Sequence, residues 1–130
     1  MIEREVATDE DRTRVAGILW KRLEKKIPLQ VDATIIYLKA QQGIPKSRWL
    51  PISNGDLKLD SPYNTYRWPG LPPGPIANPG RASLYATLYP DPVDYLFFVS
   101  RNDGTHYFSS SIREHNRAVA KYQQKRRVKK

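Results

Sequence analysis

The chain has no cysteine among its 130 residues, so disulfide and thiolate chemistry are excluded. Long apolar runs are also missing, since stretches such as 95–99 are far shorter than the roughly 18 residues that a membrane span requires. The charged residues after Met1 do not resemble a signal peptide. The sequence contains no phosphate-binding loop, dinucleotide fingerprint, zinc-ligand spacing or nucleophile elbow. We therefore expect neither a metal nor a cofactor.

Acidic residues are scarce at one end of the chain, and this explains most of its formal charge of +9. Residues 113–130 contain eight Lys or Arg and one acid, a net charge of +7, which leaves +2 for the rest. Such an end is most often a solvated helix terminus and less often a contact with anionic lipid, wall polymer or nucleic acid. We expect a single domain over residues 1–124, a basic tail over 125–130, and no nucleic-acid partner.

Helical periodicity dominates the first third of the chain. Residues 1–7 are predicted to be the end of a helix whose beginning lies outside the chain, because no N-cap precedes them. Thr8 is a predicted N-cap for a helix that ends near Lys26, before Pro28. Asp32 is predicted to cap a short helix to about residue 40. The solvent-facing side of the second helix is expected to carry Arg12, Lys21, Arg22 and Lys25.

Turn-forming residues dominate positions 44–80. This segment is longer than a simple connection between secondary-structure elements, so we expect a functional loop system. A short helix is predicted from Arg81 to Tyr89, followed by a strand over 94–100 and an N-D-G hairpin turn at 102–104. Ser111 and Glu114 form a capping-box pattern that opens a last helix to about residue 124. Its apolar face is expected to carry Ile112, His115, Val119 and Tyr122. The predicted class is α+β, with helices around a small antiparallel hairpin and a long loop region rich in Pro, Gly and Tyr.

Carboxylates are the remaining candidates for chemistry. Glu3 and Glu5 are two positions apart, so on a helix they point about 200° from each other and cannot both face one bond. Either could lie beside an apolar stripe, where partial burial would raise its pKa as a general acid requires, and periodicity does not choose between them. From the residues alone, a surface salt-bridge role is the more common one for either glutamate. His106 and His115 lie on different predicted elements, and each alone is more often structural than catalytic.

The loop region contains two distinctive segments, S-P-Y-N-T-Y at 61–66 and G-L-P-P-G-P-I-A-N-P-G at 70–80. Aromatic rings with amides and rigid turns suit a concave sugar-binding site, although buried tyrosines in a stiffened structural loop would produce the same composition.

Together with M-I-E-R-E, V-A-G-I-L-W-K-R-L, P-L-Q-V-D-A-T-I-I-Y, D-Y-L-F-F-V and G-T-H-Y-F-S, these segments make residues 1–122 resemble the catalytic domain of the YceG-like endolytic transglycosylases. The resemblance implies a lytic transglycosylase, a lyase that cleaves the MurNAc–GlcNAc bond of peptidoglycan and leaves 1,6-anhydro-MurNAc ends. It implies one glutamate acting as general acid and then base, without a second carboxylate to activate water. The alternative is a non-catalytic, peptidoglycan-binding remnant of such an enzyme.

The E-[KR]-E motif of the family corresponds to residues 3–5, and the resemblance favours Glu5 as the catalytic residue, with Glu3 as the alternative. Val6, Val31 and Ala33 depart from the residues usual in the family, and 41–56 is an unusual stretch. The resemblance also implies substrate-binding roles for the following residues: Gln30, Asp32, Tyr63, Asn64, Tyr66, Asn78 and His106.

Partners and location follow from the same resemblance. Glycan strands of peptidoglycan are the expected partner, and the cell-wall synthesis machinery is a second candidate. Family members are larger, with an N-terminal membrane anchor and a small LysM-like domain. For the full-length protein we therefore expect the extracytoplasmic face of the cytoplasmic membrane.

Overall fold

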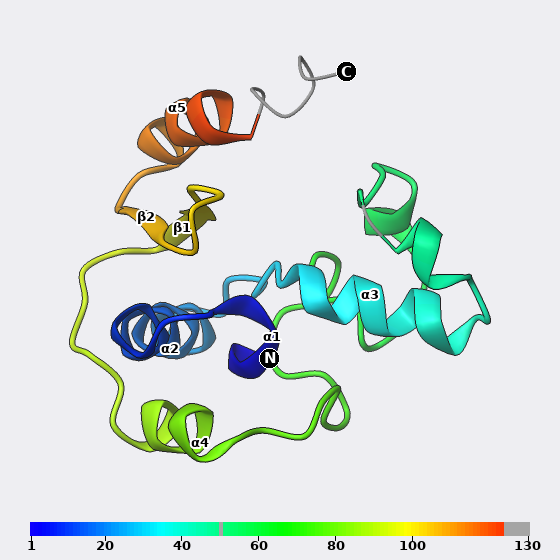
Figure 1. Ribbon diagram of the computed structural model, residues 1–130, viewed down its shortest axis with the longest axis horizontal. Coiled ribbons are helices and arrows are strands. Elements are labelled where there is room, and N and C mark those ends of the chain that lie inside the picture. The colour runs from blue at the N-terminus through cyan, green and yellow to red at the C-terminus, as the bar shows by residue number, and fades with distance from the viewer. Residues whose placement is uncertain (50, 124–130) are drawn as a thin grey trace. The chain divides into compact units, whose positions relative to one another are not determined.

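A computed structural model describes residues 1–49 and 51–123. The chain divides into two compact units (Figure 1). The first contains Met1, Glu3–Glu5 and Arg22–Asn78; the second contains Ile2, Val6–Lys21 and the described residues from Pro79 onward. Five α-helices and one two-stranded antiparallel sheet in this part of the chain confirm the predicted α+β class.

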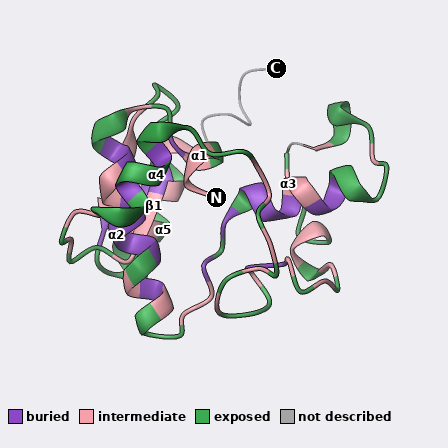
Figure 2. Cartoon of the chain, turned by 90° about the horizontal axis from the view of Figure 1, so that it is seen from below, coloured by how far each residue is buried: buried purple, intermediate pink, exposed green. Residues whose placement is uncertain are grey.

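The first unit is organised around α3 (Asp32–Gln41), which is followed by two short 3-10 helices, η1 (Lys46–Arg48) and η2 (Asp56–Lys58). Its apolar core lies just before and along α3, where the buried positions of this helix are visible in Figure 2. The core residues are Leu29, Val31, Ala33, Ile35 and Leu38. The side chain of Lys39 is buried as well, because its ammonium donates to the Asp56 carboxylate over 2.8 Å. This bond, together with Ser53, lowers the pKa of Asp56 to about 2 and joins η2 to α3.

The second unit contains most of α2 (Asp9–Glu24), which begins where Thr8 was predicted to cap it. The Thr8 hydroxyl accepts from the backbone N–H of Asp11 over 3.4 Å. Short helix α1 (Ile2–Glu5) precedes it and covers only part of the predicted helical residues 1–7. Further along the chain come α4 (Arg81–Leu88), β1 (Phe97–Ser100), β2 (His106–Ser109) and α5 (Ile112–Tyr122).

The predicted hairpin is confirmed, with Phe97 opposite Ser109 and Ser100 opposite His106. Asn102 and Gly104 both have positive φ, as this tight turn requires. Helix α5 packs on both strands, and its N-cap is Ser111, whose hydroxyl accepts from the Glu114 N–H over 3.2 Å. One half of the predicted capping box is therefore present.

Helix α2 lies unusually close to the segment that follows α4. A Cβ on Gly17 would lie 2.2 Å from the Asp91 carbonyl oxygen and 3.0 Å from Cγ2 of Val93. In the same segment, the Asp91 N–H donates to the Thr13 carbonyl over 3.1 Å, and the Thr13 hydroxyl donates to the Asp91 carboxylate over 2.9 Å. Glycine is therefore required at position 17 for close backbone packing.

Several local predictions are wrong. Asp32 is the first residue of α3, and the N-cap position belongs to Val31, which makes no side-chain capping bond. Arg12 and Arg22 are buried instead of facing solvent, because their guanidinium groups donate to Ser83 and to the Pro28 carbonyl. Strand β1 is shorter than predicted, and Ile112 is 57% exposed. The predicted helix end at 124 and the basic tail at 125–130 lie outside the described residues.

Within residues 1–49 and 51–123, no helix has the length and apolar character needed to cross a bilayer.

Candidate functional site

Glu5 is the last residue of α1, and its carboxylate reaches the N-terminus of α3. Its Oε1 accepts a hydrogen bond from the backbone N–H of Ala33 over 3.2 Å. This N–H is one of the first amides of α3, which have no partner within the helix. The Glu5 side chain, 28 positions before Ala33, therefore caps the N-terminus of α3, the role predicted for Asp32.

The environment of Glu5 favours its protonated form. Its side chain is half-buried, and burial, followed by the negative charge of Asp32, raises the pKa of Glu5 to about 7. The Ala33 N–H and the α-amino group of Met1 act in the opposite direction and are outweighed. Both protonation states of the carboxyl are therefore accessible near neutral pH, which suits a group that must both donate and accept a proton.

Asp32 lies next to Ala33 in the first turn of α3, so its carboxylate and that of Glu5 share one helix terminus. The Tyr66 hydroxyl donates to Oδ1 of Asp32. Burial and this carboxylate raise the pKa of Tyr66, so the phenol stays protonated and acts as a donor. Three predicted site residues, Glu5, Asp32 and Tyr66, are therefore brought together within the first unit.

The segment that carries Tyr66 is held rigidly. Asn64 is fully buried, and its amide donates to the carbonyls of Leu57 and Leu59 over 3.0 and 2.8 Å. Its Oδ1 accepts from the backbone N–H of Tyr66 over 3.0 Å. These bonds give Asn64 a structural role in shaping the loop, and its proposed contact with substrate stays a prediction.

Thr65 ties the same loop to the start of α3. Its buried hydroxyl accepts from the Val31 N–H over 3.0 Å and lies 2.9 Å from the Thr34 hydroxyl. The Thr65 carbonyl accepts from the backbone N–H of Gln30 over 3.0 Å. Gln30 has a φ of 53°, a left-handed conformation that is uncommon for a residue with a side chain, and its side chain is exposed.

The other predicted site residues occupy different positions. Glu3 is half-buried and acts electrostatically on the amino group of Met1. Tyr63 packs on Tyr37 of α3, with 5.0 Å between ring centroids. Asn78 is exposed at the end of the first unit. Substrate binding by Tyr63 and Asn78 stays a prediction.

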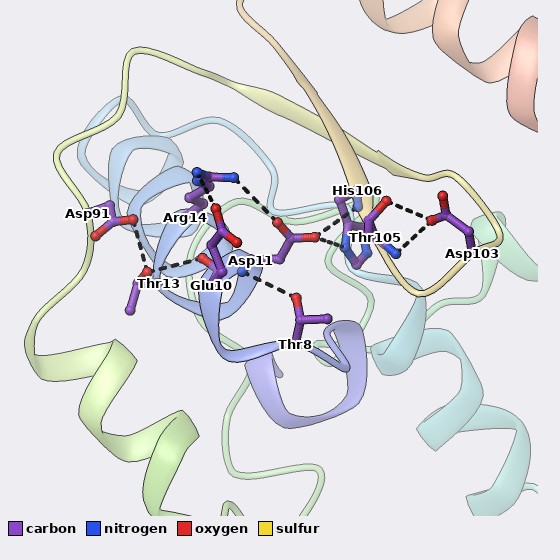
Figure 3. A network of polar contacts seen from close by, with 9 residues as sticks. All are labelled: Thr8, Glu10, Asp11, Thr13, Arg14, Asp91, Asp103, Thr105 and His106. Atoms are coloured by element: carbon purple, nitrogen blue, oxygen red, sulfur yellow. Dashed lines mark hydrogen bonds and ion pairs between the residues drawn. The ribbon is translucent and has the colours of Figure 1, made fainter.

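His106 belongs to the second unit, where it joins β2 to α2 (Figure 3). Its Nδ1 lies 3.1 Å from Oδ2 of Asp11, and the same oxygen accepts from the His106 backbone N–H over 2.8 Å. Both side chains are more than nine-tenths buried. The geometry gives His106 a structural contact, and its predicted role in substrate binding stays a prediction.

Arg22 was not predicted as part of the site, because its place in the helical period suggested solvent exposure. It is 5% exposed, its guanidinium donates to the Pro28 carbonyl over 2.7 Å, and its positive charge acts on Tyr66. Its acceptor is the carbonyl of Pro28, which lies beyond the end of α2 at Glu24, so helical periodicity gives no sign of this contact. In the described part of the chain, no three His, Asp or Glu side chains are grouped so as to hold a metal ion.

A half-buried glutamic acid with a raised pKa, at a helix N-terminus of an α+β chain, has the properties of a candidate general acid. The family model described as "YceG-like family" matches residues 1–121, and the chain belongs to this family. The family predicted from the sequence is thereby confirmed.

Relatives of known description agree with this assignment. The chain is 45% identical over 122 residues to the endolytic murein transglycosylase of Bacillus subtilis (strain 168), covering 94% of this chain and 32% of the relative. It is 32% identical over 123 residues to the protein of the same name from Streptococcus pneumoniae (strain D39), covering 94% of this chain and 22% of the relative. A crystal structure of a YceG-like protein from Listeria monocytogenes matches with a TM-score of 0.79 and 43% identity, over 90% of this chain and 36% of that one. The chain therefore spans about a third or less of the length of the named relatives.

Proposed function

We propose that this chain carries the catalytic acid of an endolytic peptidoglycan lytic transglycosylase, and that this acid is Glu5. The observation that carries the proposal is a half-buried carboxyl whose pKa is raised to about 7 at the N-terminus of α3. Both named relatives are endolytic murein transglycosylases, which supports the same substrate class. Glycan strands would be the partner, and the full-length protein would act at the outer face of the cytoplasmic membrane.

The proposed reaction needs one group that changes protonation state twice. The Glu5 carboxylic acid donates its proton to the glycosidic oxygen while the bond from that oxygen to C1 of MurNAc breaks. The resulting carboxylate accepts the proton of the MurNAc 6-hydroxyl, whose oxygen forms the new bond to C1. The products are a GlcNAc end with a free hydroxyl and a 1,6-anhydro-MurNAc end, and Glu5 is again protonated.

The test is digestion of purified glycan strands, with mass spectrometry of the new ends. We expect 1,6-anhydro ends from the unaltered protein, a loss of at least about 100-fold in Glu5→Gln, as is typical for removal of a general acid, and retained activity in Glu3→Gln. The reverse pattern would move the role to Glu3. Hydrated, reducing ends would contradict the lyase reaction and indicate that a carboxylate activates water. Glycan binding without any new ends would favour the non-catalytic alternative.

A further inference from the structure

Two acidic side chains meet at the start of α3, and the mechanism above uses only one of them. Glu5 accepts from the Ala33 N–H over 3.2 Å, and Asp32 is the adjacent residue in the same turn. The charge of Asp32 acts directly on Glu5. Asp32 itself is exposed, so its orientation depends on whatever holds its carboxylate.

Tyr66 fixes the orientation of the Asp32 carboxylate. Its hydroxyl donates to Oδ1 of Asp32, and its own backbone is fixed by the buried amide of Asn64. Thr65, the preceding residue, is bonded to Val31 at the N-cap of α3. The phenol therefore reaches Asp32 from a segment that is already anchored to the same helix.

We propose that Tyr66 is a positioning residue that holds the Asp32 carboxylate beside Glu5, so that the negative charge of Asp32 favours the protonated form of the catalytic acid. This inference rests on the proposed function of Glu5. It assigns Asp32 and Tyr66 a role in setting the acidity of the site, where the sequence suggested contacts with sugar.

Two other groups that act on Glu5 oppose the effect of Asp32. The α-amino group of Met1 and the Ala33 N–H both favour the ionised form of Glu5, and the N-terminus of α3 favours anions in general. Glu3 acts on the Met1 amino group, and the positive charge of the Arg22 guanidinium lowers the pKa of Tyr66. Glu5 nevertheless favours its protonated form, so burial and Asp32 outweigh the groups that oppose them.

The sign of the expected change follows from this balance. Replacing Asp32 by Asn removes a negative charge near Glu5, so Glu5 should lose its proton at a lower pH, by about one unit for a nearby charge of this kind. Tyr66→Phe releases the Asp32 side chain into solvent, where screening weakens its effect, so a smaller shift in the same direction is expected. In the double variant, Tyr66→Phe should add nothing to Asp32→Asn, because Tyr66 acts through Asp32.

The experiment is a titration of the Glu5 side-chain carboxyl by NMR with ¹³C-labelled glutamate, assigned with Glu5→Gln, in the unaltered protein and the three variants. Tyr37→Phe is the matched control, because it makes the same change on α3 at a ring that packs on Tyr63, and it should leave the midpoint unchanged. If Asp32→Asn does not fold, Asp32→Ala makes the same charge change. The glycan-cleavage assay should show its alkaline limb moving to lower pH by the same amount.

Equal Glu5 midpoints in the unaltered protein, Asp32→Asn and Tyr66→Phe would overturn the inference, and so would additive shifts in the double variant. Such a result would leave the proposed function intact if Glu5→Gln had lost activity. Full activity of Glu5→Gln would instead overturn the proposed function, while the NMR midpoints would still show whether the pair acts on Glu5.

Discussion

Glu5 keeps its proton near neutral pH at a cost to the stability of the fold. The pKa of its carboxyl is about 7 in the folded chain and near 4.5 when exposed, so between these two values the unfolded chain releases a proton that the folded chain retains. The free energy of unfolding therefore falls as pH rises from about 4.5 to 7. The full contribution is present below pH 4.5 and is lost above pH 7.

Glu5→Gln should consequently stabilise the protein at high pH. The amide cannot ionise and its oxygen can still accept from the Ala33 N–H, so at pH 8 we expect a gain of up to about 3 kcal/mol, since one pKa unit corresponds to about 1.4 kcal/mol. At pH 4 the two proteins should be equally stable. Urea unfolding at both values measures the difference. A variant that is less stable at pH 8 would show that the ionised carboxylate is favoured in the fold.

At the scale of single residues, the sequence predicted which residues belong to the candidate site better than it predicted the contacts that they make. Residue type and family resemblance selected Glu5, Asp32 and Tyr66, and the structure places these three side chains together. The sequence did not reveal that Glu5 itself satisfies an amide of α3, because that bond joins residues 28 positions apart. Periodicity also placed Arg22 in solvent, although the carbonyl of Pro28, beyond the end of its own helix, accepts from it.

Among the secondary-structure elements, local patterns predicted the helices and the hairpin well. Thr8, Ser111 and the N-D-G turn act over three or four residues, so their signals are complete within the sequence window that contains them. The close approach of α2 to the segment after α4 has no such signal. Gly17 lies within the helix without a local reason for a glycine, and the Asp91 carbonyl and the Val93 side chain explain why it has no side chain.

Gly17→Ala is expected to destabilise the protein by about 1–3 kcal/mol, although alanine is the better helix former. The added methyl would clash with backbone that cannot move without breaking the bonds between Thr13 and Asp91. Thermal or urea unfolding measures the effect. Gly55→Ala is the matched control, because its φ is −67° and the atom nearest to the new methyl lies 3.6 Å away, so its stability should be unchanged or slightly raised. Equal stability of Gly17→Ala and the unaltered protein would show that the segment at 91–93 yields easily.

For the whole molecule, the charge is unevenly distributed along the chain. Five of the bases that produce the net charge of +9 lie at 125–130, and the proposed chemistry uses residues of the first unit. Deleting 125–130 should therefore leave glycan cleavage unchanged. It should also weaken any binding to DNA and flatten the salt dependence of that binding, because fewer counterions are released. Cleavage assays and fluorescence anisotropy at several salt concentrations measure the two effects. Loss of a salt-sensitive DNA affinity stronger than the affinity for glycan would instead favour a nucleic-acid function.

The distances in sequence between bonded partners also bear on the order in which the hairpin and the acid centre form. The hairpin and α5 are consecutive in the chain, so their contacts close short loops and can form early. The bonds of the site join Glu5 to Ala33 and Asp32 to Tyr66, partners that are 28 and 34 positions apart. We therefore expect the acid centre to be completed late in folding and to open before the hairpin does. Amide exchange at Ala33 should be correspondingly faster than exchange at the paired amides of β1 and β2.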